Sequence, residues 1–383
     1  MKQETQLSFK SGKRFKILCF GDLHERILLD TVDKELRFKD MNLFMQVTVK
    51  ALQPDFVVLL GDTLCEWNEA GGYELYRDAL ARIIKPVTDA GIPYGYVMGN
   101  HEHDIRREEL VIKAYDELGI CYVFNEEPDI TGKLNCCVPI RSSDGTHNAF
   151  NMWFIDSNNT CEDHDVSNYD WVHADQIQWY ERRAEQLKEE NGGITVPAVL
   201  FQHIPVTEEY RLLRPAKLTE RPVAVKGHSK KKDTYYVAAE GTQGYVGEGP
   251  CAPDYNDGQF ESWKKVGDVK GAFFGHDHLN DFTGEVDGIL LGQNKTSGFN
   301  AYTDGCRSCV RMIELDEHTG TLKTRIYHYK DFGLKSSSLG PIFKRISDRQ
   351  STNMHACARI LGVTAAVAAV PVAVTGLAKL MKK

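Results

Sequence analysis

The sequence predicts an α/β protein in which buried β-strands alternate with helices. Short apolar runs of β type recur along the chain, and each ends in a cluster of small residues and Asp, Asn or His. Segments with apolar residues at helical spacing, such as residues 74–90 and 175–189, separate several of these runs. Strands that alternate with helical segments in this way are typical of an α/β architecture.

Five strands of this kind are expected, at residues 15–20, 56–60, 93–98, 197–201 and 271–274. Each is followed within a few residues by side chains of metal-binding type, which are Asp22 and His24, Asp62, Asn100, His203, and His276 and His278. In open α/β sheets, ligands bind beyond the carboxyl ends of the strands. Five strands that deliver Asp, Asn and His at the same end therefore predict one shared site.

The spacing within these motifs indicates which side chains can bind the same metal ion. Asp22 and His24 are separated by a single residue, so an extended strand end points both to the same side. His276 and His278 have the same spacing and can enter the same cleft, each reaching a different ion. Asp62 offers two carboxylate oxygens, so it can bridge two ions roughly 3.5–4 Å apart.

The chemistry of this set favours two divalent transition-metal ions as cofactors. Two carboxylates, one amide and four imidazoles suit Mn, Fe, Zn or Co better than Ca, and no thiolate is required. Two such ions leave a surplus of positive charge, which attracts a phosphate and lowers the pKa of a bound water. A hydroxide that bridges the two ions can then attack phosphorus in line. His101, beside Asn100, can give the leaving oxygen its proton or, alternatively, only bind a phosphate oxygen.

The order of the motifs GDLHE, GDTLCEWN, GNHE, QHIP and GHDH resembles the calcineurin-like metallophosphoesterase superfamily over about residues 15–330. That resemblance implies a four-layer α/β/β/α sandwich, with two mixed β-sheets and a binuclear metal centre at the strand ends. It also implies that one ion is bound by Asp22, His24, Asp62 and His278, and the other by Asp62, Asn100, His203 and His276. His101 matches the histidine of the family's GNH motif.

Within the superfamily, residues 151–176 and 275–282 are similar to the purple acid phosphatase branch, including its small members in plants and fungi. True purple acid phosphatases carry an iron-ligating Tyr three residues after the second motif's Asp, and Cys65 stands at that place here. His24 is present instead. We therefore expect no purple charge-transfer colour, and we interpret Cys65 as a buried thiol in preference to a thiolate ligand.

The segment between His203 and His276 is longer than one strand–helix–strand step needs. Long loops in compact domains are usually functional or disordered. Three successive lysines at 230–232 are either a solvated surface or a site for an anionic substrate or lipid. Glu240 and Glu248 flank a glycine-rich run and are predicted, together with Asn100 and His101, to contact the substrate.

The leading functional prediction is a phosphomonoesterase. A phosphodiesterase that acts on cyclic nucleotides or lipid-type diesters shares the same ligand set and remains an alternative. A non-enzymatic scaffold on the same fold is a third interpretation, which the complete ligand set disfavours. No nucleic acid partner is expected, because the net charge is −8 and binding by counterion release needs clustered Lys and Arg.

Two further predictions concern cysteine and histidine side chains outside the motifs. The ten cysteines are scattered, which is typical of reduced and mostly buried thiols. Cys306 and Cys309 form one C-x-x-C pair, but no second pair stands at zinc-site spacing, so a tight turn is favoured. His164, among acidic neighbours, is interpreted as part of a solvated loop.

The ends of the chain suggest the domain organisation. No apolar signal-peptide core precedes the first strand, so we expect a cytoplasmic catalytic domain at residues 1–335. A polar linker is predicted at 336–357 and a hydrophobic helix at 358–383. Within it, Ile360–Ala378 carries no charge and is flanked by basic residues. As a helix, a segment of this length just spans a bilayer, so it is a membrane anchor, a surface-lying helix or a helix packed on the domain.

Overall fold

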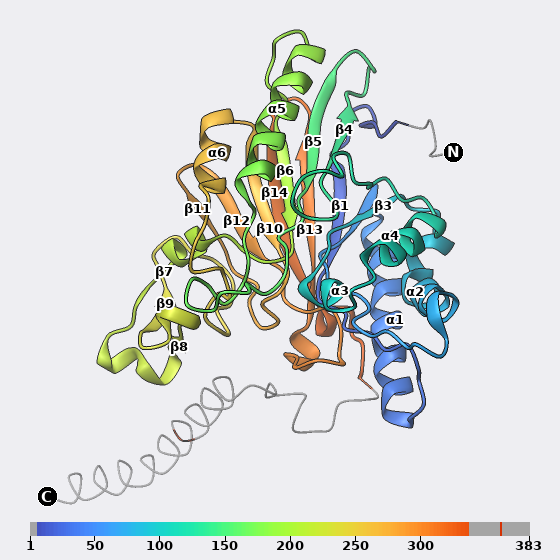
Figure 1. Ribbon diagram of the computed structural model, residues 1–383, viewed down its shortest axis with the longest axis vertical. Helices are drawn as coiled ribbons and strands as arrows, with labels where there is room; N and C mark the ends of the chain where they lie inside the picture. The colour runs from blue at the N-terminus through green and yellow to red at the C-terminus, as the bar shows by residue number, and fades with distance from the viewer. Residues whose placement is uncertain (1–5, 337–360, 362–383) are drawn as a thin grey trace, which may run out of the picture.

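Two mixed β-sheets face each other in the computed structural model, which describes residues 6–336 and residue 361 (Figure 1). The first sheet has the strand order β14 (Thr321–His328), β13 (Cys309–Asp316), β1 (Phe15–Phe20), β2 (Phe56–Leu59) and β3 (Tyr94–Tyr96). Strands β1, β2 and β3 run parallel, whereas β13 and β14 are antiparallel to their neighbours.

The second sheet contributes the other two motif-bearing strands. Its order is β11 (Thr283–Val286), β12 (Ile289–Gln293), β10 (Val269–Phe274), β6 (Ala198–Gln202), β5 (Asn148–Phe154) and β4 (Cys136–Arg141). Strands β5, β6, β10 and β12 are parallel, and β4 and β11 run antiparallel at the two edges. All five strands predicted from the sequence are present, and only their ends differ slightly from the predicted ones.

Helices cover the outer faces of both sheets (Figure 1). Helices α1 (Val32–Leu52), α2 (Gly72–Asp89) and α4 (Glu108–Glu117) lie beside the first sheet, and α5 (Ala174–Glu190) and α6 (Gln259–Val266) lie beside the second. The predicted helical segments 74–90 and 175–189 correspond to α2 and α5. The buried side of α2 includes Leu80, Ile83 and Val87, which follow helical spacing. The predicted four-layer α/β/β/α sandwich is confirmed.

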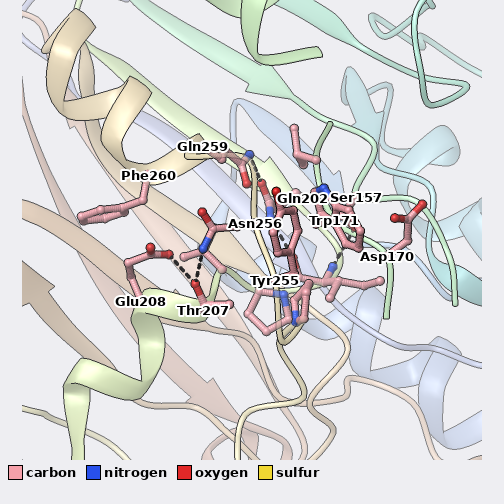
Figure 2. A pocket seen from close by; sticks show the side chains of 15 residues that line it. Ser157, Asp170, Trp171, Gln202, Thr207, Glu208, Tyr255, Asn256, Gln259 and Phe260 are labelled. Carbon is pink, nitrogen blue, oxygen red and sulfur yellow. Dashed lines mark hydrogen bonds between the residues drawn. The ribbon is translucent and has the colours of Figure 1, made fainter. Parts of the chain in front are cut away.

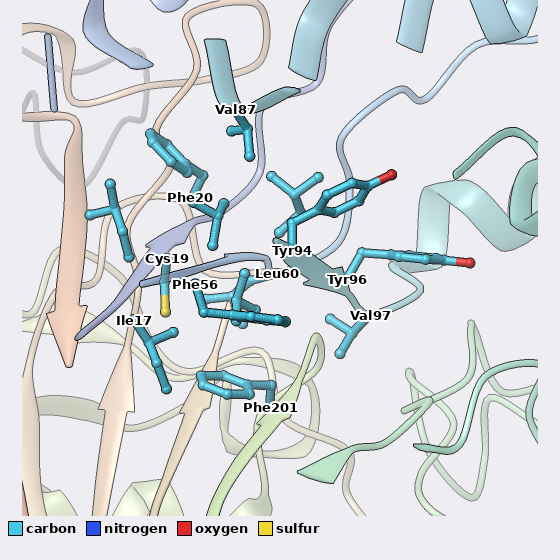
Figure 3. Close-up of a cluster of buried hydrophobic side chains, with 14 of the residues drawn as sticks. Ile17, Cys19, Phe20, Phe56, Leu60, Val87, Tyr94, Tyr96, Val97 and Phe201 are labelled. Carbon is cyan, nitrogen blue, oxygen red and sulfur yellow. The ribbon is translucent and has the colours of Figure 1, made fainter. Parts of the chain in front are cut away.

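The core between the two sheets holds the strand ends in fixed relative positions (Figure 3). Phe56 of β2 packs against Phe154 of β5, with ring centroids 6.3 Å apart, and Phe154 lies 5.4 Å from Phe201 of β6. All three rings are buried. Because burying a Phe side chain contributes about 1.5–3 kcal/mol, these contacts across the sheets fix the ends of β2 and β6 against each other.

The segment between β6 and α6 forms a third, small sheet, which was not expected from the sequence. Its strands are β7 (Leu213–Pro215), β9 (Tyr235–Ala238) and β8 (Val225–Lys226), in that order. The 3₁₀ helix η2 (Leu218–Val223) joins β7 to β8, and η3 (Ser229–Lys231) joins β8 to β9. In Figure 1 this small sheet projects from the main body.

The predictions for the C-terminal part of the chain, including the linker at 336–357 and the apolar segment Ile360–Ala378, fall almost wholly outside the described residues. They therefore stay predictions. In the part of the chain that the structure does describe, every helix is too short or too polar to cross a membrane.

Candidate metal centre

The side chains that follow the five motif-bearing strands meet in one buried cluster. Asp22, His24, Asp62 and His276 all have a positive φ, at 50°, 47°, 50° and 69°. The left-handed conformation costs a non-glycine residue roughly 1–2 kcal/mol, and such strain concentrates at functional sites. We predicted that Asp22 and His24 converge because they extend a strand. That reason was wrong, since both residues have a left-handed backbone conformation after β1.

Asp22, His24 and His278 form the first group of potential metal ligands. Their nearest ligand atoms all lie within 4.8 Å of one another. The Nε2 atoms of His24 and His278 are 3.0 Å apart, and Nε2 of His278 lies 3.6 Å from Oδ1 of Asp22. All three residues are buried.

Asp62, His203 and His276 form the second group, again within 4.8 Å of one another. Nε2 of His203 lies 3.3 Å from Oδ2 of Asp62 and 3.1 Å from Oδ1 of Asn100. The same Oδ2 lies 3.4 Å from Nε2 of His24. Asp62 therefore stands between the two groups, where a bridging carboxylate would have to be.

Backbone contacts hold these carboxylates in place. The His276 amide donates to both carboxylate oxygens of Asp22, at 3.0 and 3.1 Å, and the His101 amide donates to Oδ1 of Asp62 at 3.0 Å. Glu102 accepts hydrogen bonds from the amides of Asp62, at 2.8 Å, and of Gly99, at 3.0 Å. The last residue of the GNHE motif thus fixes the turn after β2.

The imidazoles are oriented as metal ligands. Nδ1 of His203 donates to the Leu60 carbonyl at 2.7 Å, and Nδ1 of His278 donates to the Tyr302 carbonyl at 2.9 Å. A proton held on Nδ1 leaves the lone pair of Nε2 directed into the cluster. Nε2 of His276 is buried without a hydrogen-bond partner among the described residues. A buried polar atom of this kind is expected where an ion completes its coordination, so the residues present fit a metal pair.

Burial and charge set the protonation of the cluster. Burial lowers the pKa of His24 to about 4 and holds the pKa of His276 well below its usual range, so both are neutral at neutral pH. Burial alone would raise the pKa of Asp62, but the facing His203 holds it well below the usual range. Burial alone would lower the pKa of His203, but the facing Asp62 raises it to about 10, and burial raises the pKa of Asp22 well above its usual value. The residues of the cluster by themselves therefore combine the neutral imidazoles of His24 and His276 with an ion pair between Asp62 and His203.

His101 stands at the rim of the cluster, in the short helix α3 (Asn100–Asp104). Its side chain is 44% exposed, and its ring lies 5.2 Å from that of His24. Nδ1 of His101 pairs with Oδ2 of Asp104 at 3.0 Å, and Asn159 donates to the other oxygen of Asp104 at 3.1 Å. This chain of contacts leaves Nε2 of His101 available to a ligand in the cluster.

Cys65 lies behind His24. Its Sγ is 3.3 Å from Nδ1 of His24, the ring nitrogen opposite the one that faces His278. Burial raises the pKa of the Cys65 thiol well above its usual value. Cys65 is half-buried rather than fully buried, and its raised thiol pKa favours a neutral thiol over a thiolate ligand.

Tyr302 and Glu248 support His278, and their role was not found from the sequence. The Tyr302 ring stacks on the His278 ring, with centroids 4.0 Å apart and planes 10° apart. The Tyr302 hydroxyl lies 3.3 Å from Oε2 of Glu248, whose Oε1 accepts from the Leu279 amide at 2.9 Å. Glu248 is thus buried behind the cluster, whereas Glu240 is exposed in the turn after β9.

The glycine-rich run at residues 241–250 is fastened to the loop that carries His276 and His278. Asn280 accepts hydrogen bonds from the amides of Gly247 and Glu248, at 2.8 and 3.1 Å. A Cβ at Gly247 would lie 2.6 Å from the Leu279 carbonyl. Glycine is required there by the close approach of two backbones.

A narrow pocket lies on the other side of β6 (Figure 2). Gln202 and Ile204 line it, and His203 between them points to the opposite side, toward the first sheet. Gln202 accepts a hydrogen bond from Gln259 of α6 at 2.7 Å. Because strand residues alternate in direction, this pocket is separate from the histidine cluster.

The remaining predicted residues lie outside the cluster. Among the described residues, neither Cys306 nor Cys309 forms a disulfide, and burial raises the pKa of Cys309. Neither of them, nor His164, belongs to a group of potential metal ligands within the described residues.

Comparison with known proteins gives matches over most of the chain. The family model described as calcineurin-like phosphoesterase matches residues 15–280. A relative from Arabidopsis thaliana named "Probable inactive purple acid phosphatase 14" is 29% identical over 339 residues, which cover 81% of this chain and 77% of that protein. A second, "Probable inactive purple acid phosphatase 29" of the same plant, is 26% identical and covers 82% and 80%. Among solved structures, a dimetal phosphatase from Danio rerio aligns with a TM-score of 0.44 at 12% identity, covering 83% of this chain and 99% of that chain.

Proposed function

The chain belongs to the calcineurin-like phosphoesterase family, and we propose that it is a metal-dependent phosphoester hydrolase whose preferred substrates are phosphomonoesters. One observation carries this proposal. Potential ligands from the ends of five strands meet in three overlapping groups, of which Asp62 belongs to two: one with His203 and His276, and one with His24 and His101. This arrangement supports a site for two ions rather than one.

We assign four side chains to each ion, with Asp62 shared. The first ion takes Asp22, His24, Asp62 and His278, and the second takes Asp62, Asn100, His203 and His276. Mixed imidazole and carboxylate donors favour Mn, Fe or Zn. When bound, two such ions supply the Lewis acidity and the positive charge that phosphoester hydrolysis requires.

In this proposal His101 holds the proton that the leaving oxygen receives. Its Nδ1 is engaged by Asp104, so Nε2 is the atom that faces the substrate. Asn159 fixes Asp104 from a second loop and so limits the rotation of the pair. A positioned acid of this kind contributes roughly 10²–10⁴-fold to the rate.

The preference for monoesters rests on the relatives, which are named as purple acid phosphatases. Those names also contain the word inactive, which is said of those plant proteins. In this chain all seven assigned ligands and His101 are present, and this favours catalysis over a scaffold role. A phosphodiesterase would use the same ligands and is the alternative that the experiment distinguishes.

The test uses the full-length chain purified without chelator. Bound metal is measured by elemental analysis, and p-nitrophenyl phosphate is compared with bis-p-nitrophenyl phosphate in the presence of Mn²⁺. We expect about two transition ions per chain and faster cleavage of the monoester. Asp62→Asn should lose both metal and turnover, whereas the matched control His318→Ala, at an exposed histidine outside the cluster, should retain both.

Each of the other possible results would support a different function or a different site. Faster cleavage of the diester would identify a phosphodiesterase. A chain that binds no transition metal and cleaves neither substrate would be a scaffold on the same fold. Turnover that survives in Asp62→Asn would place the chemistry elsewhere in the molecule.

A further inference from the structure

The small projecting sheet has a charge opposite to that of the whole chain. We call residues 211–238, which comprise β7, β8, β9, η2 and η3, the basic lobe. The lobe contains eight Lys or Arg and two acids, Glu220 and Asp233, although the chain as a whole has a net charge of −8. It projects from the body at one end of the two large sheets (Figure 1).

Glu220 pairs with one arginine of the lobe, and most of the other cations of the lobe are not neutralised. Its carboxylate forms two hydrogen bonds with Arg214, at 2.7 and 2.8 Å, and accepts the Lys217 amide at 2.8 Å. Arg211 pairs with Asp287, outside the lobe. Within the described residues, the other cations of the lobe have no ion-pair partner; these are Lys217, Arg221, Lys226, Lys230, Lys231 and Lys232.

Two strongly exposed aliphatic side chains lie close to three of these cations, Lys217, Arg221 and Lys226, along the chain. Leu218 is 85% exposed, more than any other large apolar side chain in the described residues, and Val223 is 57% exposed. They are the first and last residues of η2, and Arg221 between them lies over the Tyr235 ring. Scattered apolar surface residues are normal, but here two of them belong to one short 3₁₀ helix of a projecting basic element.

We propose that the basic lobe is a docking surface for an anionic lipid membrane. Leu218 and Val223 enter the boundary between headgroups and acyl chains, and the Lys and Arg side chains of the lobe contact the lipid phosphates and carboxylates. A membrane offers a broad negative surface above an apolar layer, which matches a basic segment that carries exposed aliphatic side chains. An acidic protein would need a separate apolar pocket for each of these two side chains.

The lobe is also connected to the histidine cluster. His228, at the start of the η3 turn, stacks on Tyr169 with centroids 5.7 Å apart, and the Tyr169 ring meets His276 edge-on at 4.4 Å. Docking through the lobe therefore keeps the cluster close to the lipid surface. The docking surface goes beyond the proposed hydrolysis and does not depend on it, so its test measures binding alone.

The experiment is co-sedimentation of the full-length chain with phosphatidylcholine vesicles that contain or lack about 30 mol % phosphatidylserine. Lys217→Glu with Lys226→Glu reverses two lobe charges and should weaken binding to the anionic vesicles about tenfold or more. Lys39→Glu with Lys50→Glu is the matched control, because both lysines are exposed on α1, on the other side of the molecule in Figure 1. Leu218→Ser with Val223→Ser should weaken binding without changing the dependence on salt.

The possible results distinguish membrane binding by the basic lobe from membrane binding by another part of the chain. Equal binding to both kinds of vesicle, or equal binding of the lobe variant and the wild-type chain, would overturn the proposal. Failure to bind either vesicle, together with lobe-dependent binding to a polyglutamate peptide, would replace the membrane with an acidic protein. Unchanged circular dichroism and thermal midpoints of the variants are required, so that lost binding is not lost folding.

Discussion

The Tyr302 ring lies flat against His278, and the Tyr302 carbonyl accepts the Nδ1 proton of the same histidine. One residue thus fixes both the ring plane and the tautomer of a candidate metal ligand. The hydroxyl of Tyr302 is in turn held by Glu248. Partners of this kind orient ligands and raise their basicity, and their loss typically weakens metal binding roughly 10–100-fold.

Tyr302→Leu removes the stacked ring and keeps the main-chain acceptor, so we expect metal affinity to fall about tenfold. Tyr302→Phe keeps the stack and loses only the contact with Glu248, and it should have a smaller effect. The measurement is metal retained per chain after dialysis against graded chelator concentrations. Tyr255→Leu, in the exposed loop before α6, is the control. Retention by Tyr302→Leu equal to that of the wild type would reduce Tyr302 to a packing role.

The ligand residues at the strand ends could be predicted because the pattern that identifies them lies within a few consecutive residues. An apolar run ends in Asp, Asn or His at a short offset, as in Phe15–Phe20 before Asp22. Tyr302 and Glu248 have no such signal. They lie far from His278 along the chain, on either side of it, and their contact depends on the paths of two loops without periodicity. The small sheet was missed for a similar reason, since its strands are too short to show an alternating pattern.

Cys65 provides a second test of how a ligand is oriented. When Nε2 of His24 faces the cluster, its Nδ1–H points at the Cys65 sulfur, 3.3 Å away. Cys65→Val leaves this buried N–H without an acceptor, which costs about 1–3 kcal/mol, whereas Cys65→Ser keeps an oxygen acceptor. We expect weaker metal binding in the Val variant and partial recovery in the Ser variant, measured by titration calorimetry with Mn²⁺. Equal affinities in the two variants would show that the thiol only fills space.

The role proposed for His101 makes a prediction about leaving groups. His101→Ala should retain its metals but lose roughly 10²–10⁴-fold in the rate of cleavage of alkyl phosphates, and much less for p-nitrophenyl phosphate. The difference arises because an acidic leaving oxygen needs little protonation. Asp104→Asn should shift the rates in the same direction by a smaller factor, since it weakens only the orientation of His101. Equal losses for both leaving groups would assign His101 to phosphate binding.

The buried Lys295 explains why the loop that carries Tyr302 keeps its shape. Its Nζ lies 3.0 Å from Oδ2 of Asp281 and 2.7 Å from Oδ2 of Asp304, and the ammonium group is almost fully buried. Burial raises the pKa of Asp281, but Lys295, with a smaller contribution from His328, outweighs it and holds that pKa below its usual range. Breaking a buried pair by removing one partner costs about 3–5 kcal/mol, because it leaves an uncompensated charge.

Lys295→Met should therefore lower the free energy of unfolding by about 3–5 kcal/mol at pH 7. A depressed pKa stabilises the folded state above the unfolded value, near pH 4, and this contribution is lost as the pH falls through the folded value. Without Lys295, burial raises the pKa of Asp281, and its protonation near pH 4 relieves the unpaired charge. The loss of stability in Lys295→Met should thus be smaller at pH 4 than at pH 7 in urea unfolding. Lys323→Met, at an exposed site on β14, should change stability by less than about 0.5 kcal/mol at either pH. A loss that is the same at both pH values would mean that packing of the lysine stem, and not its charge, stabilises the loop.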